Sequence, residues 1–284
     1  MRALAIALAI GAAAGQPGGA EEQGEAAPAP ERAIVWAVGD AATAGPAPRR
    51  LAATIRRGSP DRFLYLGDVY EYGTLAEFRR YYDPLYGGLA AITEPTPGNH
   101  EWGNRHRGYY PYWLAKKGRR QPPWSSVTIA GWELVNLNSE AAHGRDSRQL
   151  RWLRRVLAPG GDCRIAFWHR PRYSAGLVHG DAPDMAPLWG ALRGRAKAVL
   201  SGHEHDLQRL RPRDGLTQYV AGAGGRARYS LARDDRRLAW GRDDTGGALR
   251  IVLGPGAATL EFRDQAGRLL DRSRLACGPY PARR

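Results

Sequence analysis

Four short apolar runs, each ending in a polar residue, constrain the fold more than any other feature of this 284-residue sequence. The runs are AIVWAVGD (33–40), RFLYLGD (62–68), CRIAFWH (163–169) and AKAVLSGH (196–203). An apolar run of about four to eight residues between turn signals is typical of a strand that is buried on both faces. The sequence therefore predicts four buried strands, each with a polar side chain at its carboxyl end.

Amphipathic segments separate these runs, with apolar side chains at helical spacing in 48–58, 74–91, 146–158 and 185–195. Strands that alternate with helices predict a sheet with parallel strands and helical cover. Residues 125–139 instead predict two strands around an Ala-Gly turn, and several strands follow Leu216 without helices between them. We expect a second, more antiparallel sheet, and hence an α/β fold: a two-sheet β-sandwich flanked by helices. The longest loop insertion is expected at 104–123.

The N-terminal residues differ from the rest of the chain. MRALAIALAIGAAAG (1–15) has one basic residue, a short apolar stretch and small residues after it, which predicts a secretory signal peptide. Residues 16–32 are rich in Gly, Pro, Ala and Glu, as expected of a disordered leader. We expect one folded domain at 33–277, a tail at 278–284, and export to the periplasm or the medium. No later run reaches the roughly 18 apolar residues of a membrane-spanning helix, so no stable membrane span is expected.

The formal net charge of +14 raises the question of a polyanionic partner. Nearly all of the basic charge is arginine, and the arginines are scattered without an aromatic-interleaved basic stripe. This distribution favours a solvated surface, and no specific nucleic-acid partner is expected. The two cysteines, Cys163 and Cys277, can pair after export, but their spacing fits two separate buried thiols equally well.

The polar residues at the strand ends are of the types that bind metal ions. In α/β sheets, functional residues collect beyond the carboxyl ends of the strands. Carboxylate, amide and imidazole groups together suit zinc, iron or manganese better than calcium, which favours oxygen alone. The candidate residues are Asp40, Asp68, Asn99, His100, His169, His203 and His205.

These residues also resemble a known family, the calcineurin-like metallophosphoesterases, and within it the purple acid phosphatase type. The motifs occur in the family's order: GD (39–40), GDVY (67–70), GNHE (98–101), FWH (167–169) with HG (179–180), and GHEH (202–205). The resemblance runs from about Val35 to Cys277 and implies a four-layer α/β/β/α fold. Cys277 falls where secreted relatives carry a cysteine, which favours the disulfide.

The resemblance also implies two metal ions, iron together with zinc, manganese or a second iron. One metal would take Asp40, Asp68, a tyrosine and His205. The second would take Asp68, Asn99, His169 and His203. His100 and His179 match positions that contact the phosphate, and His100 is the candidate for protonating the leaving group. Arg170 and Arg172 follow His169 and are further candidates for contact with the substrate.

The tyrosine ligand is the point at which this sequence departs from the family. Most members carry a histidine two residues after the first aspartate, and that position is Ala42 here. In the purple type a tyrosine three residues after the bridging aspartate replaces it, but that position is Glu71, and tyrosines stand on either side of it. We expect Tyr70 to be the ligand; Tyr72 is the alternative, and a site without a tyrosine is the third possibility.

The resulting functional hypothesis is a secreted acid phosphatase-like enzyme that hydrolyses phosphate monoesters through a metal-bound hydroxide. A metal-dependent phosphodiesterase is the alternative within the same class. A non-catalytic basic protein that binds polyanions is the alternative from a different class. The Gly-rich stretch VAGAGGRARY (220–229) lacks the ending of a nucleotide-binding loop, so we expect a tight backbone passage near the metal site there.

Overall fold

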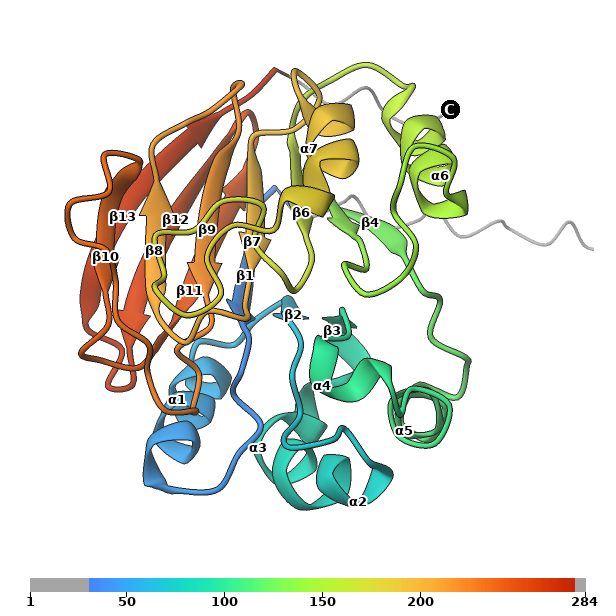
Figure 1. The fold of residues 1–284 in the computed structure, drawn as a ribbon, viewed down its shortest axis with the longest axis vertical. Helices are drawn as coiled ribbons and strands as arrows, with labels where there is room; N and C mark the ends of the chain where they lie inside the picture. The colour runs from blue at the N-terminus through green and yellow to red at the C-terminus, as the bar shows by residue number, and fades with distance from the viewer. Residues whose placement is uncertain (1–30, 279–284) are drawn as a thin grey trace, which may run out of the picture.

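Two β-sheets packed face to face form the centre of the fold (Figure 1). The structure is a computed structural model, and it describes residues 31–278. The predicted signal peptide lies outside these residues, as do nearly all of the predicted leader and tail. The prediction of a two-sheet sandwich flanked by helices is confirmed.

The first sheet has the strand order β13-β12-β11-β1-β2-β3. Its strands are β1 (Ala33–Val38), β2 (Arg62–Tyr65), β3 (Thr93–Pro95), β11 (Gly247–Gly254), β12 (Ala257–Asp264) and β13 (Leu269–Ala276). The first three are parallel to one another, whereas β11 pairs with β1 in the antiparallel sense and continues into an antiparallel meander.

The second sheet has the strand order β10-β8-β9-β7-β6-β5-β4. Its strands are β4 (Ser125–Ile129), β5 (Trp132–Asn136), β6 (Arg164–Phe167), β7 (Ala198–Ser201), β8 (Leu207–Leu210), β9 (Thr217–Ala221) and β10 (Leu238–Arg242). Parallel pairing joins β5, β6, β7 and β9, and antiparallel strands stand at both edges.

The two sheets are thus both mixed, which corrects the prediction of one parallel-containing sheet and a more antiparallel second one. The parallel strands are divided between the sheets, and the strands after Leu216 extend both of them. Hydrophobic periodicity identifies a buried strand, but it carries no information about which strands pair.

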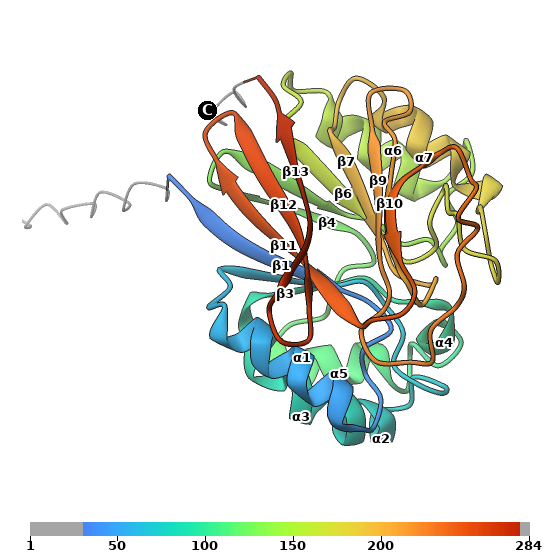
Figure 2. The same cartoon turned by 90° about the vertical axis from the view of Figure 1, so that its left-hand side faces the viewer.

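Helices cover the outer face of each sheet, which gives four layers (Figure 2). The helices are α1 (Pro46–Arg57), α2 (Leu75–Glu77), η1 (Phe78–Tyr82), α3 (Asp83–Tyr86), η2 (Gly87–Ile92), α4 (Asn99–Trp102), α5 (Tyr109–Lys117), α6 (Arg148–Leu157), η3 (Pro183–Met185) and α7 (Ala186–Leu192). Side chains of α1, α3 and α5 pack on the first sheet, and those of α6 and α7 pack on the second. None of the helices between residues 31 and 278 is long and apolar enough to span a membrane.

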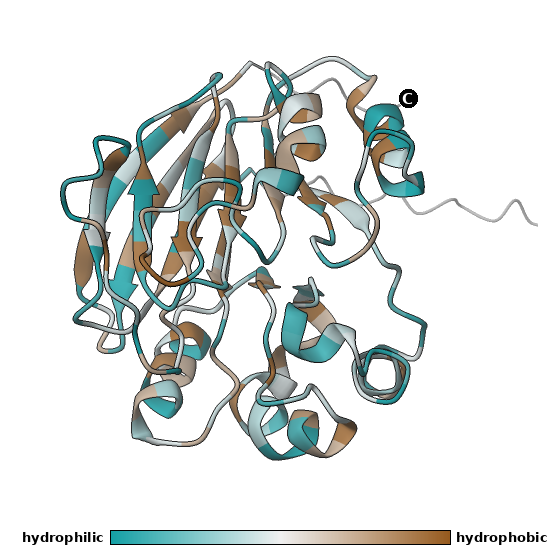
Figure 3. Cartoon of the chain, in the orientation of Figure 1, coloured by the Kyte–Doolittle hydropathy of each residue, from teal (hydrophilic) through white to brown (hydrophobic). Residues whose placement is uncertain are grey.

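The β1 strand shows why the apolar runs have no polar residue at alternate positions before their ends. Val35 and Ala37 face the core between the sheets, whereas Trp36 and Val38 face the core beneath the helices. Successive side chains of a strand point to opposite faces, so a strand covered on both sides must be apolar throughout. Figure 3 shows hydrophobic residues recurring along the strands, with hydrophilic residues in many of the connecting loops.

The predicted loop insertion at 104–123 contains a helix, α5, so this prediction was wrong. Tyr109, Tyr112 and Trp113 are buried in the aromatic core beneath the first sheet. Pro111 stands in the first turn of α5, where the missing backbone N–H would have no partner within the helix anyway. Aromatic packing therefore fixes a helix in a segment whose prolines, glycines and charges suggested a loop.

Cys163 and Cys277 form a disulfide, which confirms the pairing implied by the family resemblance. Cys163 precedes β6 of the second sheet, and Cys277 follows β13 of the first. The bond therefore links the two sheets directly.

Candidate metal centre

The polar residues that follow the central strands meet at one end of the sandwich. The first sheet supplies Asp40, Asp68 and Asn99, and the second supplies His169, His203 and His205. Contacts of 2.8–3.4 Å connect these residues across the two sheets. The structure thus brings together every strand-end residue that the sequence singled out as a metal ligand.

Three of these residues adopt a backbone conformation that is uncommon for residues other than glycine. Asp40, Asp68 and His203 have φ angles of 57°, 67° and 71°. Such conformations cost about 1–3 kcal/mol each, and they cluster at functional sites because the surrounding structure must enforce them. Their occurrence at three strand ends of one site supports a functional role.

Two glycines of the motifs are required by the density of side chains around them. A Cβ atom on Gly67 would lie 2.6 Å from Nδ1 of His169, and one on Gly98 would lie 2.0 Å from Oδ1 of Asp68. Both distances are far shorter than van der Waals contact. The glycine before Asp68 and the glycine before Asn99 therefore make room for the ligands themselves.

The hydroxyl of Tyr70 lies within the cluster. Its Oη atom is 2.7 Å from Oδ1 of Asp40, 3.2 Å from Oδ2 of Asp68 and 2.9 Å from Nε2 of His205. The Tyr72 side chain, in contrast, is 68% exposed. Of the three alternatives left open by the sequence, the geometry fits Tyr70.

The histidine tautomers show whether a cation fits the site. Nδ1 of His169 lies 2.8 Å from the Leu66 carbonyl oxygen, so it carries a proton and donates it there. Its Nε2 atom faces Oδ1 of Asn99 at 3.0 Å and Nδ1 of His203 at 3.1 Å. When His169 is neutral, its Nε2 atom and the Oδ1 atom of Asn99 are both acceptors, so a proton or a metal ion must lie between them. The residues therefore fit a metal ion as well as they fit a proton.

His205 is oriented in the same way. Its Nδ1 atom donates to the carbonyl oxygen of Ala227 at 2.7 Å, which leaves Nε2 directed at Tyr70 and Asp40. A backbone acceptor that fixes the tautomer of a ligand imidazole is a usual feature of metal sites. His205, Tyr70 and Asp40 thus form a second group of candidate ligand atoms beside Asp68.

The electrostatics of the cluster favour positive charge between its carboxylates. Burial opposes ionisation of both Asp68 and His169, but their mutual attraction is stronger. It holds the pKa of Asp68 well below its usual value and raises the pKa of His169 to about 10. Burial, together with the neighbouring His169, lowers the pKa of His203 to about 2, which keeps that imidazole neutral and able to bind a metal.

His100 and His179 lie beside this cluster, as the family resemblance implies. Nδ1 of His100 lies 2.5 Å from the carbonyl oxygen of Glu71, and its Nε2 lies 3.8 Å from Oδ2 of Asp68. The ring of His179, an exposed residue, stacks on the ring of His203, with centroids 4.0 Å apart. Both imidazoles are therefore at the edge of the centre.

Two arginines that the sequence suggested as substrate contacts are directed elsewhere. The guanidinium of Arg170 donates to Glu140 and Asp184. The guanidinium of Arg172 stacks on the ring of Tyr173, 4.2 Å from its centroid. Neither side chain makes a contact with the metal ligands in the described part of the chain, so the structure does not support this part of the prediction.

Sequence reasoning did not assign a role to three other residues that the structure places against the centre. Glu101 is buried, and its carboxylate accepts hydrogen bonds from the backbone N–H groups of Asp68 and Val69. The guanidinium of Arg226 lies over the ring of Tyr70 at 4.2 Å, and the ring of Tyr229 stacks on His205 at 4.0 Å.

Arg226 and Tyr229 belong to the stretch 220–229, whose proximity to the metal site was predicted from its glycines. That prediction is confirmed, because a Cβ atom on Gly222 would lie 2.8 Å from Oδ2 of Asp40. The glycines that predicted this proximity were the only feature of the sequence that could have pointed to these two side chains.

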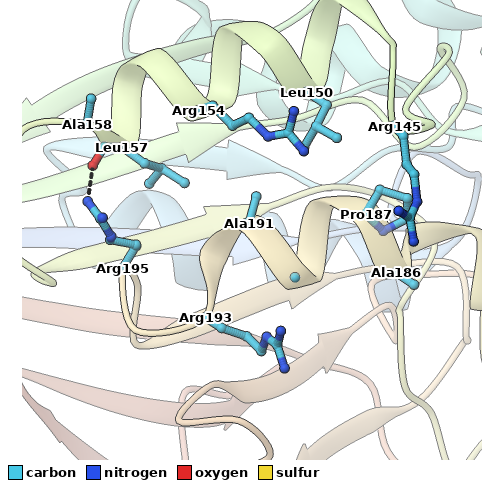
Figure 4. A pocket seen from close by; sticks show the side chains of 11 residues that line it. Arg145, Leu150, Arg154, Leu157, Ala158, Ala186, Pro187, Ala191, Arg193 and Arg195 are labelled. Atoms are coloured by element: carbon cyan, nitrogen blue, oxygen red, sulfur yellow. Dashed lines mark hydrogen bonds between the residues drawn. The ribbon is translucent and has the colours of Figure 1, made fainter.

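A separate hollow lies outside this cluster. It is a groove of about 640 Å³ between α6 and α7, in which Arg145 and Arg154 extend over apolar residues such as Leu150 and Pro187 (Figure 4). It shares no lining residue with the metal centre, so the chemistry of the site does not depend on it.

A family model described as calcineurin-like phosphoesterase matches residues 35–207. The chain belongs to the calcineurin-like phosphoesterase family. The match covers all of the strand-end ligands and both histidines at the edge of the centre. It confirms the family that the motifs suggested.

Individual relatives of this phosphoesterase are distant. The human tartrate-resistant acid phosphatase type 5 is 26% identical over 165 residues, which are 53% of this chain and 50% of that protein. The rabbit protein of the same name is 28% identical over 138 residues, which are 45% of this chain and 42% of that protein. The chain therefore spans about half the length of these relatives.

Solved structures share the fold. A purple acid phosphatase from yellow lupin seeds matches with a TM-score of 0.72 at 17% identity, covering 86% of this chain and 54% of that one. GAP50 of Plasmodium, described as the anchor in the inner membrane complex, matches with a TM-score of 0.70 at 14% identity, covering 86% and 89%. At such identities these matches establish the four-layer fold.

Proposed function

We propose that this chain is a secreted, dinuclear-metal phosphoesterase that hydrolyses phosphate monoesters. One observation carries the proposal: the ligand atoms form two groups that share Asp68. Tyr70 contacts Asp40, His205 and Asp68, whereas His169 contacts Asn99, His203 and the same Asp68. A carboxylate between two groups of ligands can bind two cations at once, as in two-metal phosphoester chemistry.

Iron with zinc, manganese or a second iron fits the proposed donor set. A phenol oxygen beside carboxylates and imidazoles suits iron, and the second group, without a phenol, suits zinc or manganese. Two cations held in these groups would supply Lewis acidity to the phosphate oxygens and lower the pKa of a water molecule.

The protein itself supplies orientation and proton transfer. His169 and His205 are held in one tautomer by backbone carbonyls, so their Nε2 atoms stay directed into the site. A protonated His100, whose Nδ1 donates to the Glu71 carbonyl, presents an Nε2–H at the edge of the centre. From there the proton can pass to the departing alcohol, which is general acid catalysis.

The His100 role gives a direct test. We expect His100→Ala to reduce kcat for an alkyl phosphate by about 10²–10⁴-fold, the usual contribution of a positioned acid. The loss should be smaller for a nitrophenyl phosphate, whose leaving group needs no proton. Metal content should stay normal; its loss would identify His100 as a ligand instead.

The whole proposal is tested on the mature chain purified without a chelator. Elemental analysis should find two metals per chain, and a chromogenic phosphate monoester should be hydrolysed faster than the corresponding diester. Chelation should abolish turnover, and adding metal back should restore it. Faster hydrolysis of the diester would make the protein a phosphodiesterase.

A non-catalytic binding protein is the second candidate, favoured by the net charge of +14 and by the shared fold of GAP50, which is described as an anchor. A chain without two metals and without turnover, but with salt-sensitive binding to polyanions, would support that candidate.

Secretion is proposed on two grounds. The sequence 1–15 has the pattern of a signal peptide, and disulfides such as Cys163–Cys277 persist mainly in oxidising compartments. Fractionation of cells that express the full chain, with mass analysis of the mature N-terminus, would test it.

A further inference from the structure

The segment that follows β7 presents its side chains to two different partners. His203 and His205 belong to the metal centre. Glu204 and Gln208 instead contact the loop 174–180, which carries His179 at the edge of that centre. One short segment therefore holds both the metal ligands and the neighbouring loop.

Glu204 is the stronger of the two contacts with the loop. The residue is fully buried, and its Oε1 atom accepts hydrogen bonds from the backbone N–H groups of His179, at 3.0 Å, and Gly180. A carboxylate that accepts two N–H groups makes charge-assisted bonds, which are stronger than neutral ones. Glu204 thus fixes the backbone of His179 itself.

The carboxyl group of Glu204 also packs against the start of the loop. A Cβ atom on Gly176 would lie 2.2 Å from Cδ of Glu204. Gln208 adds a further attachment, because its Oε1 accepts from the backbone N–H of Ala175 at 2.7 Å. The loop is therefore held to the 203–208 segment at both of its ends.

This attachment determines where the His179 ring lies. The ring stacks on that of His203, with centroids 4.0 Å apart and planes 23° apart, although His179 is an exposed residue. Its position above a metal ligand depends on a backbone that Glu204 holds.

We propose that Glu204 is a positioning residue that fixes His179 above the metal centre, where the imidazole binds the phosphate group of the substrate. The inference rests on the proposed function, but it assigns a role to the acidic residue between the two histidines. Glu204 itself does not contact the substrate and acts through His179.

A double-mutant cycle tests this role. We expect Glu204→Ala to raise KM for the monoester, and Kd for inorganic phosphate, by about tenfold, because the backbone of His179 and Gly180 loses its charge-assisted hydrogen bonds. The value of kcat and the metal content should change little. Glu204→Gln should restore most of the affinity, because its amide oxygen still accepts both N–H groups.

The decisive comparison is made in the His179→Ala background. Two residues that act as one unit are not additive, so Glu204→Ala should have no further effect on KM or Kd there. Additive effects, or an unchanged Kd in the single variant, would overturn the proposal.

Because both neighbours of Glu204 are candidate metal ligands, a second variant approaches the same contact from the loop. Gly176→Ala pushes the loop away from Glu204 and leaves the 203–208 segment intact. It should raise Kd for phosphate as well, again only when His179 is present; an unchanged Kd would refute the proposal. Because phosphate binding by calorimetry needs no turnover, a failure of the proposed hydrolysis would be recognised separately.

Discussion

Removing the hydroxyl of Tyr70 is the most informative single perturbation of the site. Tyr70→Phe keeps the ring, which is buried beneath Arg226, and deletes only the Oη atom. That atom lies 2.7 Å from Asp40, 3.2 Å from Asp68 and 2.9 Å from His205. Tyr72→Phe is the matched control, because the same chemical change is made in a side chain that is 68% exposed.

The expected magnitude follows from these contacts. The hydroxyl has one proton, which it donates to the nearest carboxylate, that of Asp40, and a hydrogen bond to a charged group contributes about 1.5–3 kcal/mol. In a domain of this size each kcal/mol changes Tm by roughly 2–4 °C. With about 2 kcal/mol lost, the chelator-treated Tyr70→Phe protein should melt about 4–8 °C below the wild type. Tyr72→Phe should stay within about 0.5 kcal/mol of it.

The metal-loaded protein provides the functional half of the assay. If iron is bound, Tyr70→Phe should lose the visible phenolate band, and it should release metal at a lower chelator concentration than the wild type. Tyr72→Phe should keep both the band and the metal. A band that survives in Tyr70→Phe and disappears in Tyr72→Phe would refute the assignment. If melting temperatures of the two chelator-treated variants were equal, the energetic reasoning would be wrong.

Three further predictions concern stability. Cys163→Ser with Cys277→Ser opens a loop of 114 residues and should lower the free energy of unfolding by about 4–5 kcal/mol, measured by urea titration and compared with the reduced wild type. Glu133→Gln weakens a fully buried ion pair with Arg164 and should cost about 3–5 kcal/mol in the same assay; a loss below 1 kcal/mol would show that the pair contributes little. Burial alone would raise the pKa of Glu261, but the arginines around it hold that pKa below its usual value. The stabilisation from this carboxylate is present above the ordinary glutamate pKa and is lost as the pH falls through the folded one, so Glu261→Gln should be less stable than the wild type near pH 6 and equally stable in strong acid.

The sequence predicted the elements of the fold well wherever periodicity was clear. Residues 33–40 contain β1, and 163–169 contain β6, each shortened because the last polar residues belong to the following loop. The helices predicted at 146–158 and 185–195 correspond to α6 and α7. The strands are buried on both faces and the two helices pack one apolar face on a sheet, so burial determines both the sequence pattern and the structure.

What the sequence could not predict depends on contacts between distant segments. The pairing of β11 with β1 places the C-terminal strands beside the first strand, and no local pattern encodes this neighbour. The family motifs identified the candidate metal ligands, which the structure brings together, but not the position of Arg226 over the Tyr70 ring. Arg170 directly follows His169, a candidate ligand, but its guanidinium binds Glu140 and Asp184 and does not contact the site. Side-chain direction at a loop is set by its partners, which only the folded structure brings together.

The division of the ligands between the sheets has a consequence for the cohesion of the molecule. Neither sheet alone carries a complete set, because Asp40, Asp68 and Asn99 come from one, and the histidines come from the other. The disulfide joins the same two sheets before the first residue of β6, whereas His169 lies beyond the last. A cation held by these side chains would therefore form a second cross-link between the two sheets, at the end of the sandwich opposite to the disulfide. Metal that stays bound during unfolding would therefore indicate that the two sheets are still packed together.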